Sequence, residues 1–364
     1  MKNLSDEFHP ATSLDPQKDE EQHSLRCEWD FNLRTVISSN STTAGTDAVG
    51  VIEFDQSQTI LATGGIARKI RIYSLTSLLP HHANALSLLD HANACDYYIS
   101  TPAKLSSLRW KPGSGSRVIG SGDYDGVVME HDVERKVAIF ERDEHGGRRV
   151  WSVDYSHWQP VVGASGSDDG TMQLWDPRCD GGGSVATTAV LKKAVCCVEF
   201  NPFGGSIIAV GCADRRVYGY DVRMVTHPVM VLDGHKKTVT YVRFVDNATL
   251  ASASIDGRLS LWNLEDCEMI RSYKGHVNRR NFVGLSVWRT GGLLGCGSEN
   301  NQVVVYDKRW GEPIWGHGSE QVGDHVFVNS VCWRQVDEDE CTLVTGGSNG
   351  VLQVFEVKRK PMHS

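Results

Sequence analysis

Several features that would point to other classes of protein are missing from this sequence of 364 residues. No apolar run approaches the roughly 18 residues of a membrane-spanning helix, and the polar start at 1–10 has no apolar signal segment. The net charge of −8 provides no overall positive field, which disfavours generic nucleic-acid binding. The ten cysteines include no CxxC pair. We therefore expect reduced core thiols in the cell interior, with no zinc site, no cofactor and no membrane contact.

Signatures of catalysis are absent or lie in the wrong structural context. No GxxxxGK[ST] phosphate-binding loop occurs. The segment 346–350 matches the GxSxG nucleophile elbow in letters, but it lies between two expected strands, whereas the elbow requires a strand followed by a helix. His81, His82 and His91 have no cysteine or carboxylate at ligand spacing, which favours a solvated loop over a metal site. We expect a protein that is not an enzyme.

Glycine and aromatic residues are abundant, with 36 Gly beside 10 Trp, 10 Tyr and 10 Phe. This combination is typical of many short strands joined by tight turns. A single motif, Val/Leu-x-x-apolar-x-aromatic, recurs seven times with small variations, at intervals of 56, 45, 45, 44, 44 and 45 residues. Its copies begin at Val49, Leu105, Val150, Val195, Val239, Val283 and Val328.

Each copy is followed by a second apolar stretch, a turn that in most copies contains Asp or Asn, and a third strand ending in an aromatic residue or His131. Asp and Asn bond to nearby backbone and Gly supplies positive φ, so these segments are hairpin turns. Trp175-Asp176 is the WD dipeptide, and Gly-His pairs end at His235 and His276. The sequence thus resembles WD40 repeats, which implies an all-β, seven-bladed β-propeller. In that family a hydrogen-bonded set lies inside the blade, here His235, Ser254, Asp256 and Trp262.

The ring of blades needs a closing strand, because too few residues follow the last repeat to form one. Residues 28–37 alternate apolar Trp29, Phe31 and Leu33 with polar neighbours, the period of a half-buried strand. We predict that 28–37 forms the outer strand of the seventh blade within one propeller domain at 27–358. An insertion at 76–102 accounts for the long first interval, and a Gly-rich loop lies at 179–184. Residues 1–26, with six acidic side chains, and 359–364 are predicted to be tails.

One mouth of the channel is predicted to be cationic and aromatic, although the chain is acidic overall. In a propeller the starts of the inner strands and the turns after the second strands meet there. Such a surface suits an acidic, partly apolar peptide, because cations pair with carboxylates and rings bury aliphatic or Pro side chains. Wall packing with a solvated rim is the structural alternative, and RNA stacking is another. The residues are Lys104, Tyr124, Arg149, Trp151, Cys196, Arg215, Lys237, Arg279, Arg280 and Phe282.

A narrower resemblance rests on segments beyond the shared WD40 positions. Trp151-Ser-Val-Asp, Gly166-Ser-Asp-Asp, Cys196-Cys-Val, Gly234-His-Lys-Lys and Asn281-Phe-Val-Gly-Leu look like the propeller of the plant constitutive-photomorphogenic ubiquitin ligase. No RING or coiled coil accompanies them here, and this form resembles the plant repressors of UV-B photomorphogenesis. The resemblance implies binding to the UV-B photoreceptor, promotion of its return to the inactive homodimer, and residence in nucleus and cytoplasm.

The same resemblance carries two sets of site residues. In the ligase propeller, Val-Pro peptides with acidic flanks bind the mouth, and the matching positions are Lys104, Tyr124, Arg149, Trp151, Cys196, Lys237 and Phe282. Arg215 and Arg279 depart from the ligase, which has His and Glu there.

The second set is the WDxR box, by which some propellers dock on the adaptor of cullin-RING ligases. Trp175, Asp176 and Arg178 match it fully, whereas Asp221 with Arg223 and Asp307 with Arg309 follow Tyr instead of Trp. The alternative function is therefore a substrate receptor of a cullin-RING ubiquitin ligase that recruits a light-signalling transcription factor for degradation. The constitutive-photomorphogenic ligase itself is a further candidate partner.

Overall fold

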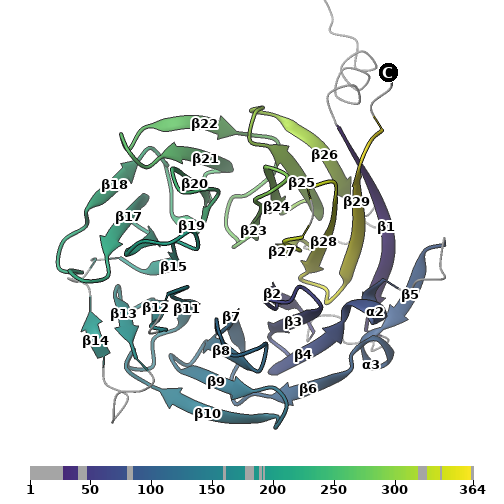
Figure 1. Cartoon of the computed structure of the whole chain (residues 1–364), viewed down its shortest axis with the longest axis horizontal. Helices are drawn as coiled ribbons and strands as arrows, with labels where there is room; N and C mark the ends of the chain where they lie inside the picture. Colours follow the sequence, from purple (N-terminus) through teal and green to yellow (C-terminus); the bar gives the residue numbers. More distant parts are fainter. Residues whose placement is uncertain are drawn as a thin grey trace, which may run out of the picture.

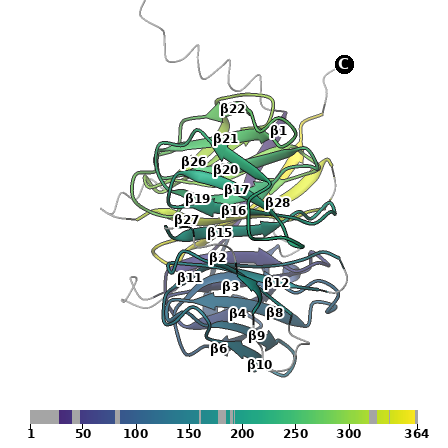
Figure 2. The same ribbon diagram turned by 90° about the vertical axis from the view of Figure 1, so that its left-hand side faces the viewer.

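Seven β-sheets stand around a central channel like the blades of a propeller (Figure 1). The computed structural model describes residues 28–39, 47–79, 85–158, 161–176, 184–187, 191, 193–318, 326–336 and 338–361. Strands β22 and β10 lie at opposite sides of the ring in both views (Figures 1 and 2). No helix in these ranges is long and apolar enough to cross a membrane. The predicted tail at 1–26 and residues 179–183 of the predicted loop at 179–184 fall outside the described residues.

Six of the sheets are four-stranded and antiparallel. Blades 1 to 3 contain β2 (Val49–Phe54), β3 (Ile60–Gly65), β4 (Lys69–Ser74) and β6 (Tyr97–Ser100); β7 (Leu105–Trp110), β8 (Val118–Asp123), β9 (Val128–Asp132) and β10 (Val137–Arg142); and β11 (Val150–Tyr155), β12 (Gly163–Ser167), β13 (Met172–Trp175) and β14 (Ser184–Thr187). Blades 4 to 6 contain β15 (Val195–Phe200), β16 (Ile207–Cys212), β17 (Arg216–Asp221) and β18 (Met230–Asp233); β19 (Val239–Phe244), β20 (Thr249–Ser254), β21 (Arg258–Asn263) and β22 (Met269–Tyr273); and β23 (Leu285–Trp288), β24 (Leu293–Gly297), β25 (Gln302–Asp307) and β26 (Pro313–Gly318).

The seventh blade is closed by the N-terminal strand, as predicted. It contains β27 (Val328–Trp333), β28 (Glu340–Gly347), β29 (Leu352–Arg359) and β1 (Trp29–Ser38). Strand β1 runs antiparallel to β29, from the pair Trp29 and Arg359 to the pair Ile37 and Leu352. The two ends of the described chain are thereby joined in one sheet, and β1 covers the edge of β29.

The insertion in blade 1 is shorter than the sequence predicts. Residues 97–100, inside the predicted range 76–102, form β6, the ordinary outer strand of blade 1. The additional part contains α2 (Leu75–Leu78), β5 (Ser87–Asp90) and α3 (His91–Ala94), and β5 pairs with β1 in parallel. The sequence did not predict β6, because its four residues do not match the repeat motif and they lie in an interval of irregular length.

Neighbouring blades pack closely through a repeated contact between glycine and valine. A Cβ at Gly122 in β8 would lie 2.6 Å from Cγ1 of Val150, and one at Gly166 in β12 would lie 2.4 Å from Cγ1 of Val195. Both valines begin the next repeat. Glycine is therefore needed at these positions, because any side chain would push the next blade outward.

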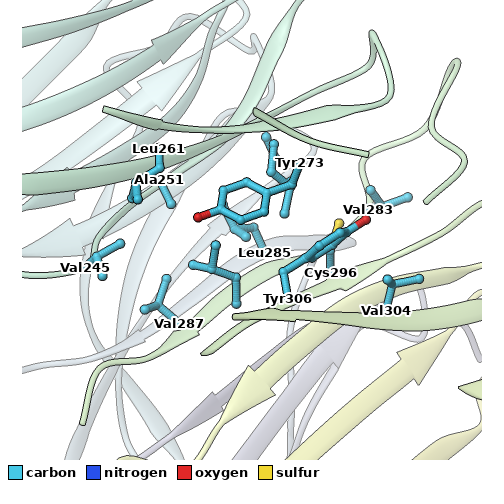
Figure 3. Packing of buried hydrophobic residues seen from close by; sticks show 13 residues of the cluster. Val245, Ala251, Leu261, Tyr273, Val283, Leu285, Val287, Cys296, Val304 and Tyr306 are labelled. Carbon is cyan, nitrogen blue, oxygen red and sulfur yellow. The ribbon is translucent and has the colours of Figure 1, made fainter. Parts of the chain in front are cut away.

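The core lies between the blades. Between blades 5 and 6, Tyr273 and Tyr306 meet edge to face at 5.5 Å and are surrounded by aliphatic side chains of both blades (Figure 3). Burial of each large side chain contributes about 1.5–3 kcal/mol. The aromatic residue at the end of the third strand, Tyr306 in blade 6, thus fills the space between neighbouring sheets.

The hydrogen-bonded set in blade 5 uses Ser252 rather than the predicted Ser254. His235 lies 3.2 Å from Asp256 through Nδ1 and 2.7 Å from the Ser252 hydroxyl through Nε2, and Nε1 of Trp262 donates to the same hydroxyl at 2.7 Å. Ser254 instead donates to the carbonyl of Lys237. Trp262 in β21 pairs with Leu250 in β20. Ser252 is therefore the diagonal neighbour of Trp262 on the same face of the sheet, whereas Ser254 lies two residues farther along β20 and out of reach.

Two buried histidines make the stability of the propeller depend on pH. Burial lowers the pKa of both His131 and His276 to about 4, whereas an exposed histidine titrates near ~6.5. Between these values the unfolded chain binds more protons than the folded chain. The stabilisation is therefore complete above about pH 6.5 and is lost as the pH falls toward 4, by roughly 3 kcal/mol per histidine.

We expect the melting temperature to fall steeply between about pH 7 and pH 4.5. In His276→Gln this fall should be smaller, although the variant melts lower at neutral pH. His227→Gln, which replaces an exposed histidine, is the control and should keep the slope of the native protein. Thermal melts followed by circular dichroism provide the measurement, and an unchanged slope in His276→Gln would contradict this origin of the pH dependence.

Candidate peptide-binding site

The predicted mouth residues lie on one face because a backbone hydrogen bond repeats from blade to blade. It joins the turn after the second strand to a residue just before the first strand. The amide of Tyr124 donates to the carbonyl of Lys104 at 2.9 Å, and the amide of Asp168 donates to the carbonyl of Arg149 at 3.0 Å. Blades 4, 5 and 7 have corresponding bonds, whereas in blade 6 the amide of Glu299 donates to the carbonyl of Val277, farther ahead of β23. We call this end of the channel the peptide mouth, formed by 104, 124, 149–151, 168, 196, 215, 237 and 279–282.

Two aromatic rings from opposite sides of the channel stack on each other in the peptide mouth. Trp151 belongs to β11 in blade 3, and Phe282 precedes β23 in blade 6, across the ring (Figure 1). Their centroids are 4.2 Å apart with an interplanar angle of 2°. Tyr241 meets the edge of Phe282 at 6.3 Å. The channel therefore presents an aromatic surface that can bury an aliphatic or Pro side chain.

The indole of Trp151 is held by neighbouring polar groups. Its Nε1 donates to Oδ1 of Asp168 at 2.6 Å. The guanidinium of Arg149 lies between the rings of Tyr124 and Trp151, at 4.0 Å and 4.5 Å from their centroids. Cation–π contacts of this kind contribute roughly 0.5–2 kcal/mol each. The ring is thus positioned before a ligand arrives, which reduces the ordering cost of binding.

Phe282 is positioned by a carboxylate on the neighbouring turn. Glu299 accepts hydrogen bonds from the backbone amides of Arg280 and Asn281, each at 2.7 Å. Partial burial works to raise the pKa of Glu299, but the backbone donors of Asn281 and Arg280 outweigh it and lower the pKa. Glu299 is therefore ionised at neutral pH and fixes the segment that carries Phe282.

A cavity of about 350 Å³ at the peptide mouth contains only part of the predicted set. Tyr124, Trp151, Cys196, Arg280 and Phe282 line it. Burial raises the pKa of the Cys196 thiol well above its usual range, so this side chain is a neutral part of the wall. The remaining predicted residues do not line the cavity, and of these Lys104, Arg215, Lys237 and Arg279 are exposed on the surrounding rim while Arg149 is half-buried between its two rings.

The sequence prediction missed the third position of each repeat. All seven of these residues line the cavity, namely Val51, Ser107, Ser152, Cys197, Tyr241, Leu285 and Ser330. The repeats contain the information needed to find these residues, because the third residue of every inner strand has the same orientation in each blade. Asp168, which holds Trp151, was missed because the turn acids were interpreted as turn formers alone.

Charged residues at the fifth position of the repeats in blades 1 to 5, together with Arg289 just after β23, lie farther along the channel. Arg109 pairs with Glu53 at 2.7 Å and with Asp154 at 3.0 Å, and Arg289 pairs with Glu199 at 3.5 Å. Burial raises the pKa of Glu199 although three arginines lie nearby. Arg243, at the fifth position of the blade 5 repeat, has no carboxylate partner among the described residues and donates to the carbonyl of Val242 at 2.8 Å, so it is a further cation of the cavity.

The three predicted adaptor boxes differ in what the structure shows of them. Trp175 and Asp176 are buried in blade 3, and Arg178 lies outside the described residues. Arg223 folds back on Asp221 at 2.9 Å and thereby lowers the pKa of that carboxyl well below its usual range. Arg309 pairs with Asp307 at 3.0 Å and with Glu28 at 3.1 Å. Docking of an adaptor on these boxes stays a prediction.

Comparison with known proteins agrees with this architecture. Residues 136–176 and 226–263 match the family model of the WD domain, G-beta repeat. The chain is thus a WD40 propeller, a class of proteins that act by binding other proteins.

Longer alignments identify the family. The chain is 61% identical over 328 residues to the WD repeat-containing protein RUP2 of Arabidopsis thaliana, covering 86% of this chain and 89% of RUP2. It is 58% identical over 342 residues to RUP1 of the same plant, covering 92% and 86%. The E3 ubiquitin-protein ligase COP1 of Arabidopsis thaliana is 36% identical over 316 residues, which cover 84% of this chain and 44% of the ligase. The chain belongs to the RUP family, the plant repressors of UV-B photomorphogenesis, which are WD40 negative regulators of UV-B signalling. This confirms the resemblance found in the sequence.

Proposed function

We propose that this protein binds the UV-B photoreceptor through an acidic Val-Pro segment held in the peptide mouth, and that it promotes return of the receptor to the inactive homodimer. The observation that carries the proposal is the state of the rim cations. Within the described ranges, none of Lys104, Arg149, Arg215, Lys237, Arg279 and Arg280 forms an ion pair with a carboxylate, whereas two of the three channel arginines, Arg109 and Arg289 but not Arg243, are paired. Unpaired cations around an aromatic surface favour a ligand with carboxylates beside an apolar core.

The division of the mouth into two zones supports this ligand chemistry. The stacked rings of Trp151 and Phe282 accept the Val-Pro core, because both residues are apolar and Pro is already restricted in conformation. Acidic residues on either side of the core then reach the exposed rim. We propose that the complex forms in nucleus and cytoplasm, the location that the family resemblance implies.

Salt dependence tests the electrostatic part of the proposal. A peptide with a Val-Pro core and acidic flanks should bind several-fold more weakly at about 300 mM than at about 50 mM salt, because screening weakens exposed ion pairs. The control peptide has the same core with Asn and Gln in place of the acids, and it should bind weakly at both salt concentrations. Calorimetric titration gives both affinities. Equal affinity of the acidic peptide at both salts would refute an electrostatic mouth.

Receptor redimerisation tests the second part. Monomeric photoreceptor mixed with this protein should return to the dimer faster than receptor alone, as followed by size-exclusion chromatography. A Val-Pro peptide added in excess should slow that return, because it competes for the peptide mouth. If the rate of redimerisation does not depend on this protein, the proposed role in ending the signal is wrong.

A further inference from the structure

The turns after the second strands differ between blades in one backbone position. In blades 2, 3, 5 and 7 this position is Gly126, Gly170, Gly257 and Gly350, all with positive φ. Blade 6 has Asn301 at φ 60°, whereas blades 1 and 4 have Arg68 at φ 56° and Arg215 at φ 83°. A positive φ is unfavourable for a long side chain, and such strain is often retained at functional positions. Arg68 is therefore the counterpart of the rim residue Arg215, on blade 1.

Arg68 lies between two further cations of blade 1, Lys104 and Lys69, and backbone contacts link the three into a row. Its carbonyl accepts a hydrogen bond from the amide of Thr101 at 2.9 Å, and Lys104 follows three residues later, within roughly 11 Å of extended chain. Lys69 is next to Arg68 and pairs across the sheet with Ser100. No described carboxylate forms an ion pair with Lys104, Arg68 or Lys69. The row leads from the rim of the peptide mouth outward over blade 1.

The outer end of the row reaches an exposed aromatic ring. Nζ of Lys69 lies 4.4 Å from the centroid of Tyr98, whose side chain is 51% exposed. Both line a cleft of about 490 Å³ beside α3. Of the two basic side chains of this cleft, Arg71 pairs with Asp47, whereas Lys69 has no carboxylate partner among the described residues. Lys69 is left as the cation that a ligand can use.

The cleft is held in shape by a buried histidine of the insertion. Nδ1 of His91 lies 2.7 Å from the Tyr73 hydroxyl, and Nε2 lies 2.7 Å from the carbonyl of Gly350 in the turn of blade 7. This turn is on the mouth face, because the adjacent amide of Ser348 donates to the carbonyl of Phe327, a residue of the mouth cavity. The insertion therefore joins blades 1 and 7 next to the row of cations.

We propose that the row Lys104, Arg68 and Lys69, ending at Tyr98, binds an acidic segment that continues from the peptide in the mouth. This inference rests on the proposed function and extends it to a longer ligand. The turn of blade 7, on the other side of blade 1, offers Ser348-Asn349 instead of cations, so the acidic extension runs over blade 1 rather than over blade 7. Its carboxylates pair with the row, and an apolar or aromatic residue at its end covers Tyr98.

The test compares a short Val-Pro peptide with versions lengthened at either end by a run of aspartates. One lengthened peptide should bind the native protein about five- to tenfold more tightly than the short peptide, the effect of two exposed ion pairs. The variant Arg68→Gly/Lys69→Gln should lose this gain and keep its affinity for the short peptide. Glycine accepts the positive φ at 68, so the melting temperature should not fall. Arg135→Glu, a charge change at an exposed arginine of blade 2, is the control and should keep the gain.

The outcomes separate this inference from the proposed function. If the short peptide binds and neither extension increases affinity, the row is not part of the site and only this inference is wrong. The same conclusion holds if Arg68→Gly/Lys69→Gln retains the full gain. If the short peptide itself fails to bind the native protein, the proposed function fails, whatever the lengthened peptides do.

Discussion

Deletion of residues 1–38, which removes β1, should lower the melting temperature by about 10 °C or more relative to deletion of 1–26 alone. Strand β1 places Trp29 and Ile37 in the core with 4% and 0% of their surface exposed. Phe31 stacks on Trp315 of blade 6 at 4.2 Å, and Trp29 meets Trp288 at 4.7 Å. Loss of these contacts costs about 5 kcal/mol or more, at about 1.5–3 kcal/mol per large side chain. It also exposes the edge of β29 to other chains.

Differential scanning fluorimetry and light scattering would measure both effects. The chain lacking 1–26 keeps all of β1 and serves as the matched control, with a melting temperature close to that of the intact protein. A point variant gives an independent reading, since Trp29→Ala should melt at an intermediate temperature. If both deletions melt alike, the ring does not depend on β1 for closure.

Trp151→Ala should weaken binding of the acidic Val-Pro peptide by about 2 kcal/mol, roughly thirtyfold, with little change in melting temperature. Trp151 forms the centre of the peptide mouth, where it contacts Phe282, Arg149 and Asp168. Central aromatic residues of this kind dominate binding energy, and the side chain is only half-buried, so the fold does not need it. Trp310→Ala is the matched control, because Trp310 is 43% exposed and adjoins Arg309 in blade 6, outside the peptide mouth.

Lys104→Glu extends the same experiment to charge. The substitution should weaken binding of the acidic peptide strongly at low salt and less at high salt, because it acts through an exposed charge that salt screens. Trp151→Ala should be nearly insensitive to salt. If the Trp151→Ala/Lys104→Glu double variant bound the peptide with native affinity, the peptide mouth would not be the binding site.

The fold was predictable because its information is local and repeated. Seven copies of a strand motif at nearly one spacing specify seven inner strands, and the alternation around Trp29, Phe31 and Leu33 specifies the closing strand. The predictions were wrong at positions where comparison between the repeats gives no information. Strand β6 lies at the end of an irregular interval, and the choice between Ser252 and Ser254 depends on which residue of β20 lies diagonal to Trp262.

The site was predictable in composition but not in arrangement. Propeller topology placed the cations and rings on one face, and the structure brings Tyr124, Arg149, Trp151 and Phe282 into contact. Which cations remain free for a ligand could not be deduced. Arg109 and Arg215 look alike in sequence, yet Arg109 pairs with Glu53 and Asp154 from neighbouring blades, whereas Arg215 has no such partner among the described residues.

The sequence by itself determined the seven-bladed ring, its closure by β1 and the chemistry of the peptide mouth, because hydrophobic period and turn residues act over a few neighbours. Only the tertiary structure decided that Trp151 and Phe282 stack across the channel, and that a row of free cations crosses blade 1. The first feature depends on the distance between residues more than a hundred positions apart, which is fixed when the blades pack around the channel, and the second depends on the pairing of strands within blade 1.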